Sequence, residues 1–249
     1  MTSLLFFTVL AAFSAICFTI GFLSSRNIHS VTDYFLAGRN LGTFPVMFTL
    51  IATQLGGGML LGTAQEAYIS GIYGILYTVG IMGGFLLLAA GVAARLQTFN
   101  VGTTAELFET QYNSPGLRKF AALLSIITMS GILIGQVVGA KALLSSLGFF
   151  SEPLFILFWC LIVAYTMIGG LHAVVFVDMF QVLFIIILFS GIFIYTVWHN
   201  PSTALALCQS QNQFSSDAIT NSLMLRTILF PMLFALIEQD LAQRFFASK

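Results

Sequence analysis

Three consecutive glycines, Gly56 to Gly58, lie inside an apolar stretch from Leu50 to Tyr68 that is long enough to cross a membrane. A glycine inside a helix is less favourable than alanine by roughly 1 kcal/mol, so we expect the helix to unwind here. The backbone carbonyls that unwinding frees find no partner in lipid, so such a segment must be buried in protein or line a cavity. In transporters these cavities hold ions and substrates. The stretch is therefore predicted to form a site for a small ligand.

A second polar interruption lies in the apolar run from Thr227 to Arg244, which contains Pro231 and then Glu238, Gln239 and Asp240. Proline inside a helix removes a backbone hydrogen bond and breaks or kinks the helix. Carboxylates within a span are expensive and usually functional, whereas carboxylates at the end of a span are solvated. Two interpretations stay open: these acids contact a substrate or form a gate, or they pair with Arg244 at the cytoplasmic end.

Asp178 follows the Gly169-Gly170 pair by about two helical turns. An acid at this position could receive a cation that leaves the site, and the alternative is a charge at a helix start or facing a loop. The cysteines and histidines are scattered singly, without metal-ligand spacing, so neither an enzyme nor a bound cofactor is expected. These residues are Cys17, Cys160, Cys208, His29, His172 and His199.

Composition indicates which elements must position these residues. Of the 249 residues 58% are hydrophobic and 7% charged, the formal net charge is zero, and the mean hydropathy is +0.98. A soluble domain has about a quarter of its residues charged, so this is an all-α polytopic membrane protein, and nucleic-acid binding is excluded because no basic face exists. Apolar runs predict seven transmembrane helices at roughly 3–24, 41–64, 70–95, 117–147, 153–169, 172–198 and 222–243.

The positive charges predict the orientation, because short cytoplasmic loops retain Lys and Arg. Seven lie on one side of the predicted topology, against Lys141 and Arg226 on the other. This places the N-terminus outside and the C-terminus inside, with an external loop from Asn200 to Asn221. The seven are Arg26, Arg39, Arg95, Arg118, Lys119, Arg244 and Lys249.

Glycines at four-residue spacing predict faces for close helix packing. They are Gly131, Gly135 and Gly139, and the pairs Gly58/Gly62 and Gly80/Gly84. Gln136, between the first three, is expected to hydrogen-bond a neighbouring helix, with a substrate contact as the alternative.

The two interrupted helices stand five helices apart, as expected for the first helices of two inverted repeats that face each other across a binding site. Four segments in order then resemble the sodium:solute symporter family, which includes carriers of proline, pantothenate, sugars and choline. They are D-Y-F-L-A-G-R-N (Asp33–Asn40), A-T-Q-L-G-G-G (Ala52–Gly58), G-G-L-H-A-V-V-F-V-D-M-F-Q (Gly169–Gln181) and Q-R-F-F-A-S-K (Gln243–Lys249). The triple glycine followed by G-T-A-Q-E-A-Y is similar to the choline-type branch.

The resemblance implies sodium-coupled symport of a small organic solute by alternating access, with sodium as the coupling ion. Main-chain carbonyls of Ala52 and Leu55 would bind sodium, since carbonyl oxygens suit a hard cation. Asp178 is similar to the family's acid on the sodium exit route, and Arg39 to its cytoplasmic base. The predicted substrate contacts are Gln54, Gly56, Gly57, Met59, Glu238 and Gln239.

The sequence departs from the family pattern in two ways. Gln54 stands where proline carriers have Asp. The family also has about thirteen spans, so the second repeat is expected to be truncated or supplied by a second polypeptide. The single membrane domain would comprise an extra first helix and hinge (1–40), the first inverted repeat of a five-plus-five fold (41–198), and an external loop with the first helix of the second repeat (199–249). The alternative function is a non-transporting scaffold or sensor domain, or an inactive fragment, in the inner membrane.

Overall fold

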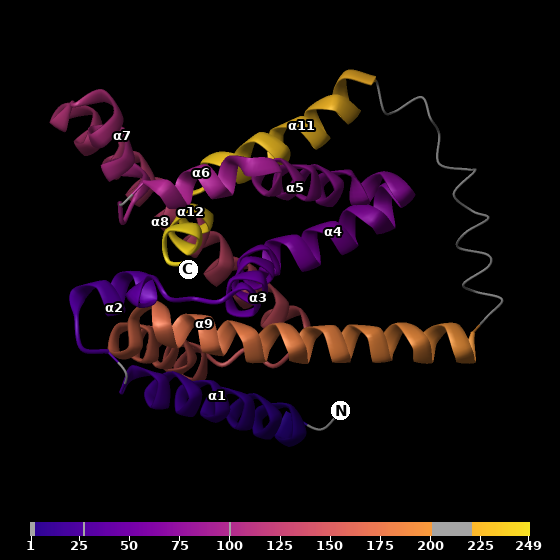
Figure 1. The fold of residues 1–249 in the computed structure, drawn as a ribbon. Helices are drawn as coiled ribbons and strands as arrows, with labels where there is room; N and C mark the ends of the chain where they lie inside the picture. Colours follow the sequence, from indigo (N-terminus) through magenta and orange to yellow (C-terminus); the bar gives the residue numbers. More distant parts are fainter. Residues whose placement is uncertain (1–2, 27, 100, 201–220) are drawn as a thin grey trace.

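Helices make up the architecture of the computed structural model, which describes residues 3–26, 28–99, 101–200 and 221–249 (Figure 1). In those ranges the only extended pairing is an isolated β-bridge between Leu41 and Ser248. The all-α prediction is therefore confirmed. The predicted external loop and Cys208 fall within residues 201–220, outside the described residues.

The helices are named in chain order as in Figure 1. They are α1 (Ser3–Ser25), α2 (Val31–Leu36), η1 (Ala37–Arg39), α3 (Thr43–Gln54), α4 (Gly57–Ser70), η2 (Gly71–Ile75), α5 (Leu76–Leu87), η3 (Leu88–Val92), α6 (Ala93–Thr98), α7 (Thr104–Tyr112), α8 (Pro115–Ser146), α9 (Glu152–His199), α11 (Asn221–Ile237) and α12 (Gln239–Phe246).

Several helices are suited to a bilayer. Four are long and apolar enough to cross one by length and composition, and the bent pair α3 and α4 makes a fifth. The apolar part of α11, Met224–Ile237, is shorter than a usual span of about 20 residues. A multi-pass membrane protein is thus confirmed, and the count of seven spans stays a prediction. The four are Leu4–Ser25, Tyr73–Thr98, Pro115–Ser146 and Glu152–His199.

Helix α9 is interrupted at Gly170, whose φ of 50° and ψ of −152° are not helical. At 1.5 Å per residue, 48 uninterrupted residues would extend about 70 Å, more than twice the thickness of a bilayer core. A side chain at Gly170 would clash with the Tyr34 carbonyl of α2, 2.4 Å from the position of a Cβ. The interruption falls between the predicted helices 153–169 and 172–198.

Two helix pairs organise the rest. Helix α1 packs along α9, and α5 packs along α11 (Figure 1). At Gly80 of α5 an added Cβ would lie 2.3 Å from the Ile228 carbonyl oxygen and 2.6 Å from Cγ of Pro231, so α11 approaches α5 closely there. The predicted packing at Gly80 and Gly84 is confirmed.

The other glycine faces differ from the prediction. A Cβ at any of them would meet nothing within 4 Å among the described residues, so their predicted close packing is not observed in this part of the chain. These glycines are Gly58, Gly62, Gly131, Gly135 and Gly139.

Short helices gather at one end of the molecule, where α2, α7 and α12 lie (Figure 1). Ser30 caps the N-terminus of helix α2, because its hydroxyl accepts a hydrogen bond from the Asp33 N–H at 3.0 Å. Hydrogen bonding with Ser30 and with the His29 N–H holds the pKa of the Asp33 carboxyl below its usual value. The C-terminal residues close this end, since the Lys249 N–H donates to the Leu41 carbonyl at 3.0 Å.

Candidate functional site

The helix that carries the triple glycine is broken, and its axis bends by 56° between its two halves, α3 and α4. Leu55 (φ −77°, ψ 40°) and Gly56 (φ −73°, ψ 165°) form the break, which confirms an interruption at the glycines. Its extent is smaller than predicted, because Gly57 and Gly58 already belong to the first turn of α4.

The helical pattern of backbone hydrogen bonds is interrupted at this break. The Leu55 N–H donates to the Ile51 carbonyl at 3.0 Å, and the helical pattern resumes where the Leu60 N–H donates to the Gly56 carbonyl at 3.0 Å. Between them, the carbonyl oxygen of Leu55, which belongs to neither helix, accepts no backbone hydrogen bond from any described residue. Unpaired carbonyl groups are the ligands that a hard cation prefers.

Gln136 of α8 supports the start of α4. Its Oε1 accepts a hydrogen bond from the Gly57 N–H at 3.0 Å, which satisfies one of the free donors at a helix N-terminus. A Cβ at Gly56 would lie 2.7 Å from Nε2 of Gln136, so glycine at this position permits the amide to approach the backbone. The expected hydrogen bond between Gln136 and a neighbouring helix is confirmed.

The second interruption lies at Glu238, which is extended (φ −66°, ψ 123°) and separates α11 from α12. The predicted interruption of this helix is therefore observed at Glu238 and not at Pro231, because α11 continues through Pro231. The proline ring packs against Gly80 of α5. This packing compensates for the backbone hydrogen bond that proline removes from α11.

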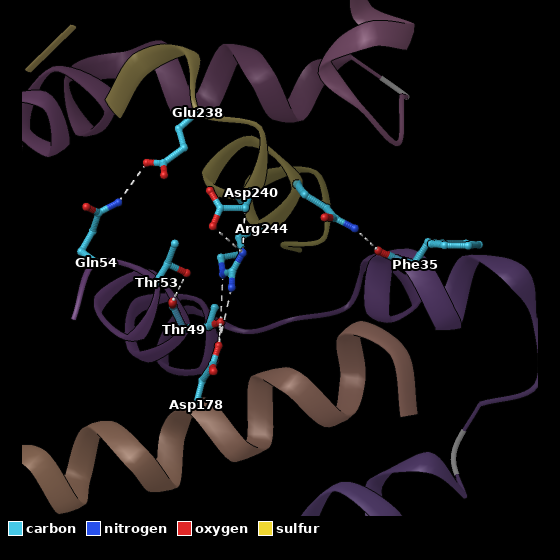
Figure 2. Close-up of polar contacts among 9 residues, drawn as sticks. Phe35, Thr49, Thr53, Gln54, Asp178, Glu238, Asp240 and Arg244 are labelled. Carbon is cyan, nitrogen blue, oxygen red and sulfur yellow. Dashed lines mark hydrogen bonds and ion pairs between the residues drawn. The ribbon is translucent and has the colours of Figure 1, made fainter. Parts of the chain in front are cut away.

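The two breaks are in contact. Nε2 of Gln54, the last residue of α3, donates a hydrogen bond to Oε2 of Glu238 at 3.0 Å (Figure 2). Residues that are 184 positions apart in the chain therefore meet where both helices are interrupted.

A cavity of about 850 Å³ adjoins this contact and lies among α4, η2, α5, α8 and α11. Four predicted substrate residues line it: Gln54, Gly56, Met59 and Glu238. Gly57 is not in the lining and instead binds Gln136, which is. Gln239 is also outside the lining, because its Oε1 accepts a hydrogen bond from the Thr104 N–H at 3.0 Å, at the start of α7.

Several lining residues lie outside the predicted set of substrate contacts, and for one of them, Gln136, a substrate contact is the alternative prediction. They include one carboxylate from α4, an amide from α8 and aromatic residues from η2, α5 and α11. Phe230 and Phe234 are four residues apart in α11, which places both on one face of that helix, and this spacing is visible in the sequence. These residues are Glu66, Gln136, Tyr73, Tyr77, Phe230 and Phe234.

A buried ionic cluster lies beside the Glu238 break and consists of Arg244, Asp178, Asp240 and Thr49 (Figure 2). Arg244 is 8% exposed. Its Nε donates to the Thr49 hydroxyl at 3.0 Å, and its Nη1 donates to the Asp240 carbonyl oxygen at 2.8 Å. Its Nη2 lies 3.6 Å from Oδ2 of Asp178, and Nη1 lies 3.9 Å from Oδ2 of Asp240.

This ionic cluster joins three helices. Thr49 is on α3, Asp178 on α9 and Arg244 on α12, and the Thr49 hydroxyl also donates a hydrogen bond to Asp178. Asp240 therefore pairs with Arg244, as one of the two interpretations expected, whereas Glu238 faces Gln54 and the cavity.

The remaining predicted residues occupy separate places. Asp178 lies in the ionic cluster, and Arg39 donates a hydrogen bond from Nη2 to the Val101 carbonyl at 3.2 Å. Ala52 and Leu55 lie in the last turn of α3 and at its break, and neither is among the cavity-lining residues.

Comparisons with known proteins place the chain in a family. No solved structure matches the chain. The model of the sodium:solute symporter family matches residues 34–248, which covers most of the chain, both breaks and the ionic cluster. The chain therefore belongs to the sodium:solute symporter family.

Proposed function

We propose that this chain carries out sodium-coupled symport of a small organic solute, by alternating access, with its site at the two helix breaks. Membership in a family of sodium-coupled carriers is one support. The observation that carries the proposal is the hydrogen bond from Gln54 to Glu238, which joins the interruption between α3 and α4 to that between α11 and α12. Paired broken helices of this kind bind ions and substrates at membrane depth in secondary transporters.

In this proposal sodium binds the main-chain carbonyls of Ala52 and Leu55. Their support is that Ala52 lies in the last turn of α3 before the break, and that the Leu55 carbonyl oxygen accepts no backbone hydrogen bond among the described residues. A hard cation prefers such oxygen ligands, which apolar side chains leave accessible.

The solute occupies the cavity beside the break. Gln54, Gly56, Met59 and Glu238 contact it, since all four line the cavity. Gly57 acts indirectly, because its N–H donates a hydrogen bond to the Gln136 side chain, which lines the cavity. Gln239 positions α12 by binding the start of α7. The similarity to the choline-type branch stays a prediction.

The ionic cluster closes the end of the site toward α12. Arg244 joins α3, α9 and α12, so these helices separate only when its contacts with Thr49 and Asp178 break. Asp178 would then become accessible to a departing sodium ion, and Arg39, on η1 before α3, lies at the same end of the chain's helical bundle.

The proposed setting is the cytoplasmic membrane, with the N-terminus outside and the C-terminus inside, as the distribution of Lys and Arg indicates. Residues 41–198 form the first inverted repeat, residues 199–249 begin the second, and a second polypeptide supplies any further helices that the site requires.

Reconstitution tests the proposal. The chain, alone and with any co-encoded partner, is placed in proteoliposomes, and uptake of labelled small organic solutes is measured with and without an inward sodium gradient. We expect uptake of at least one solute that requires the gradient and collapses when potassium replaces sodium. Absence of sodium-dependent uptake in both preparations would contradict the carrier function and favour a scaffold or sensor.

A further inference from the structure

The segment before α3, residues 35–41, is bound at both of its ends to the last part of the chain. At one end, Nε2 of Gln243 in α12 donates a hydrogen bond to the Phe35 carbonyl oxygen at 2.9 Å (Figure 2). At the other end, Leu41 makes two backbone hydrogen bonds with the residues that follow α12. Its N–H donates at 3.2 Å, and its carbonyl oxygen accepts from the Lys249 N–H at 3.0 Å.

Apolar packing reinforces these hydrogen bonds. Three side chains of the segment belong to one buried core cluster with side chains of α9 and α12. Val175 of α9, a member of this cluster, is 0% exposed. The segment therefore takes part in excluding water from α9 and α12 at this end of the molecule. The cluster members from these three elements are Leu36, Ala37, Leu41, Leu171, Val175, Ala242 and Phe246.

The backbone in the middle of the segment is strained. Ala37, Gly38 and Arg39 have φ angles of 47°, 66° and 53°, so three consecutive residues are left-handed. Only glycine adopts this conformation without cost, so Ala37 and Arg39 are held in it at a cost in free energy. Nη2 of Arg39 donates to the Val101 carbonyl oxygen at 3.2 Å, which helps to hold the turn. Strained backbone persists only where surrounding contacts impose it, so loss of those contacts would let the segment relax.

The position of the segment connects it to the ionic cluster. Leu41 lies two residues before the start of α3, and Gln243 is the neighbour of Arg244 in α12. In the proposed function, α3 and α12 separate when the contacts of Arg244 break. Because Leu41 is hydrogen-bonded to the residues after α12, the two helices cannot separate at this end while those bonds persist.

We propose that residues 35–41 form a strap that clasps the end of α12 and is released whenever the end of the molecule beside the ionic cluster opens. The strain at Ala37 and Arg39 offsets part of the stability of the clasp and so favours its release. This inference rests on the proposed carrier function for the role of the opening, but release of the strap can be measured without transport.

Labelling of a buried thiol measures release of the strap. Val175→Cys places a thiol in the core cluster, where a soluble maleimide reaches it only when the strap opens, and the three native cysteines are replaced by serine. In nanodiscs, Gln243→Leu removes the hydrogen bond to Phe35 and should accelerate labelling about fivefold. Gln111→Leu makes the same change at an exposed position of α7 and should leave the rate unchanged. Equal rates in the two variants, or labelling of neither, would overturn the inference.

A disulfide tests whether transport requires the release. Leu41 and Ser248 are partners in a parallel β-bridge, and such partners lie about 4.8 Å apart, within the span of a disulfide. Oxidation of the double variant Leu41→Cys and Ser248→Cys, with the native cysteines replaced, should abolish sodium-dependent uptake in proteoliposomes, and reduction should restore it. The two single variants are the controls, and their uptake should not respond to oxidation.

The two measurements separate this inference from the carrier function. Sodium-dependent uptake that the disulfide leaves unchanged would overturn the strap while the carrier function stands. Faster labelling in Gln243→Leu than in Gln111→Leu, without sodium-dependent uptake of any solute, would support the strap while the carrier function fails.

Discussion

Arg244 is a buried guanidinium that faces two carboxylates from different helices. Asp178 reaches it from α9 and Asp240 from its own helix, and Oδ1 of Asp240 is buried without a hydrogen-bond partner among the residues that the structure describes. Taking charges out of water is expensive, so removing one member of such a cluster leaves the others uncompensated. The packing of α3, α9 and α12 against one another therefore depends strongly on the ionic cluster.

Arg244→Gln should lower the free energy of unfolding by about 3–5 kcal/mol, because Asp178 and Asp240 would stay buried without their counter-charge. Arg118→Gln is the control. It breaks an exposed pair with Glu109 (2.6 Å), which contributes about 0–1 kcal/mol. Thermal denaturation in detergent compares the two variants, and equal melting temperatures would show that the buried cluster contributes no more than a surface pair.

The contact between Gln54 and Glu238 should appear as an energetic coupling between the two breaks. Gln54→Leu and Glu238→Leu each leave a half-buried polar partner unsatisfied, at about 1–3 kcal/mol, whereas the double variant leaves neither. The double variant should therefore lose less stability than the two single variants together, by about 1 kcal/mol or more. Strictly additive losses in melting experiments would mean that the breaks are independent.

Sequence patterns predicted the chemical nature of these residues better than their partners. Glu238 and Asp240 are polar residues in an apolar run, and that position alone marked them. Their assignment, Glu238 to Gln54 and the cavity and Asp240 to Arg244, depends on contacts with α3 and α9. Thr49 carried no signal, because one threonine in an apolar helix has many possible partners and only folding brings it to Asp178 and Arg244.

The close contact of α5 with α11 supports one wall of the cavity. At Gly80 and Gly84 the two helices approach so closely that a Cβ would overlap backbone or side-chain atoms of α11. Small residues permit such approaches in membrane proteins, where packing rather than water exclusion joins helices.

Gly80→Ala should separate α5 from α11, since the added Cβ would lie 2.3 Å from the Ile228 carbonyl oxygen. Overpacking of this kind lowers stability by about 1–3 kcal/mol. Gly131→Ala makes the same change where a Cβ meets no described residue within 4 Å, and should leave stability unchanged or raise it by up to about 1 kcal/mol. Matching melting curves for the two variants would refute the close α5–α11 contact.

Helix interruptions show where local sequence is sufficient and where it is not. The triple glycine predicted a break between α3 and α4, but the acceptor that Gln136 offers to Gly57 lets α4 start within the glycines. Pro231 stays helical because Gly80 gives its ring room, and the chain breaks instead at Glu238. Glycine spacing alone likewise did not distinguish the packed face at Gly80 from the open face at Gly131, since the neighbouring helix decides this.

Across the whole molecule, the cavity and the ionic cluster lie on either side of the joined breaks. The cavity is lined by α4, α5, α8 and α11, and the ionic cluster joins α3, α9 and α12. A carrier that works by alternating access needs a binding site and a contact that closes it on one side. The cavity is the candidate for the binding site, and the ionic cluster is the candidate for the closing contact. Coupling then follows if filling the site changes the balance between closed and open states of the cluster.

Sodium-dependent uptake by Gly57→Leu is the most direct test of the claim that the break is the transport site. A leucine there begins 3.3 Å from Oε1 of Gln136 and would displace that side chain into the cavity. Gly131→Leu, on an open face of α8, is the matched control, and gel filtration verifies that both variants insert and fold. We predict that Gly57→Leu abolishes sodium-dependent uptake in proteoliposomes while Gly131→Leu retains it, and normal uptake by Gly57→Leu would contradict this account.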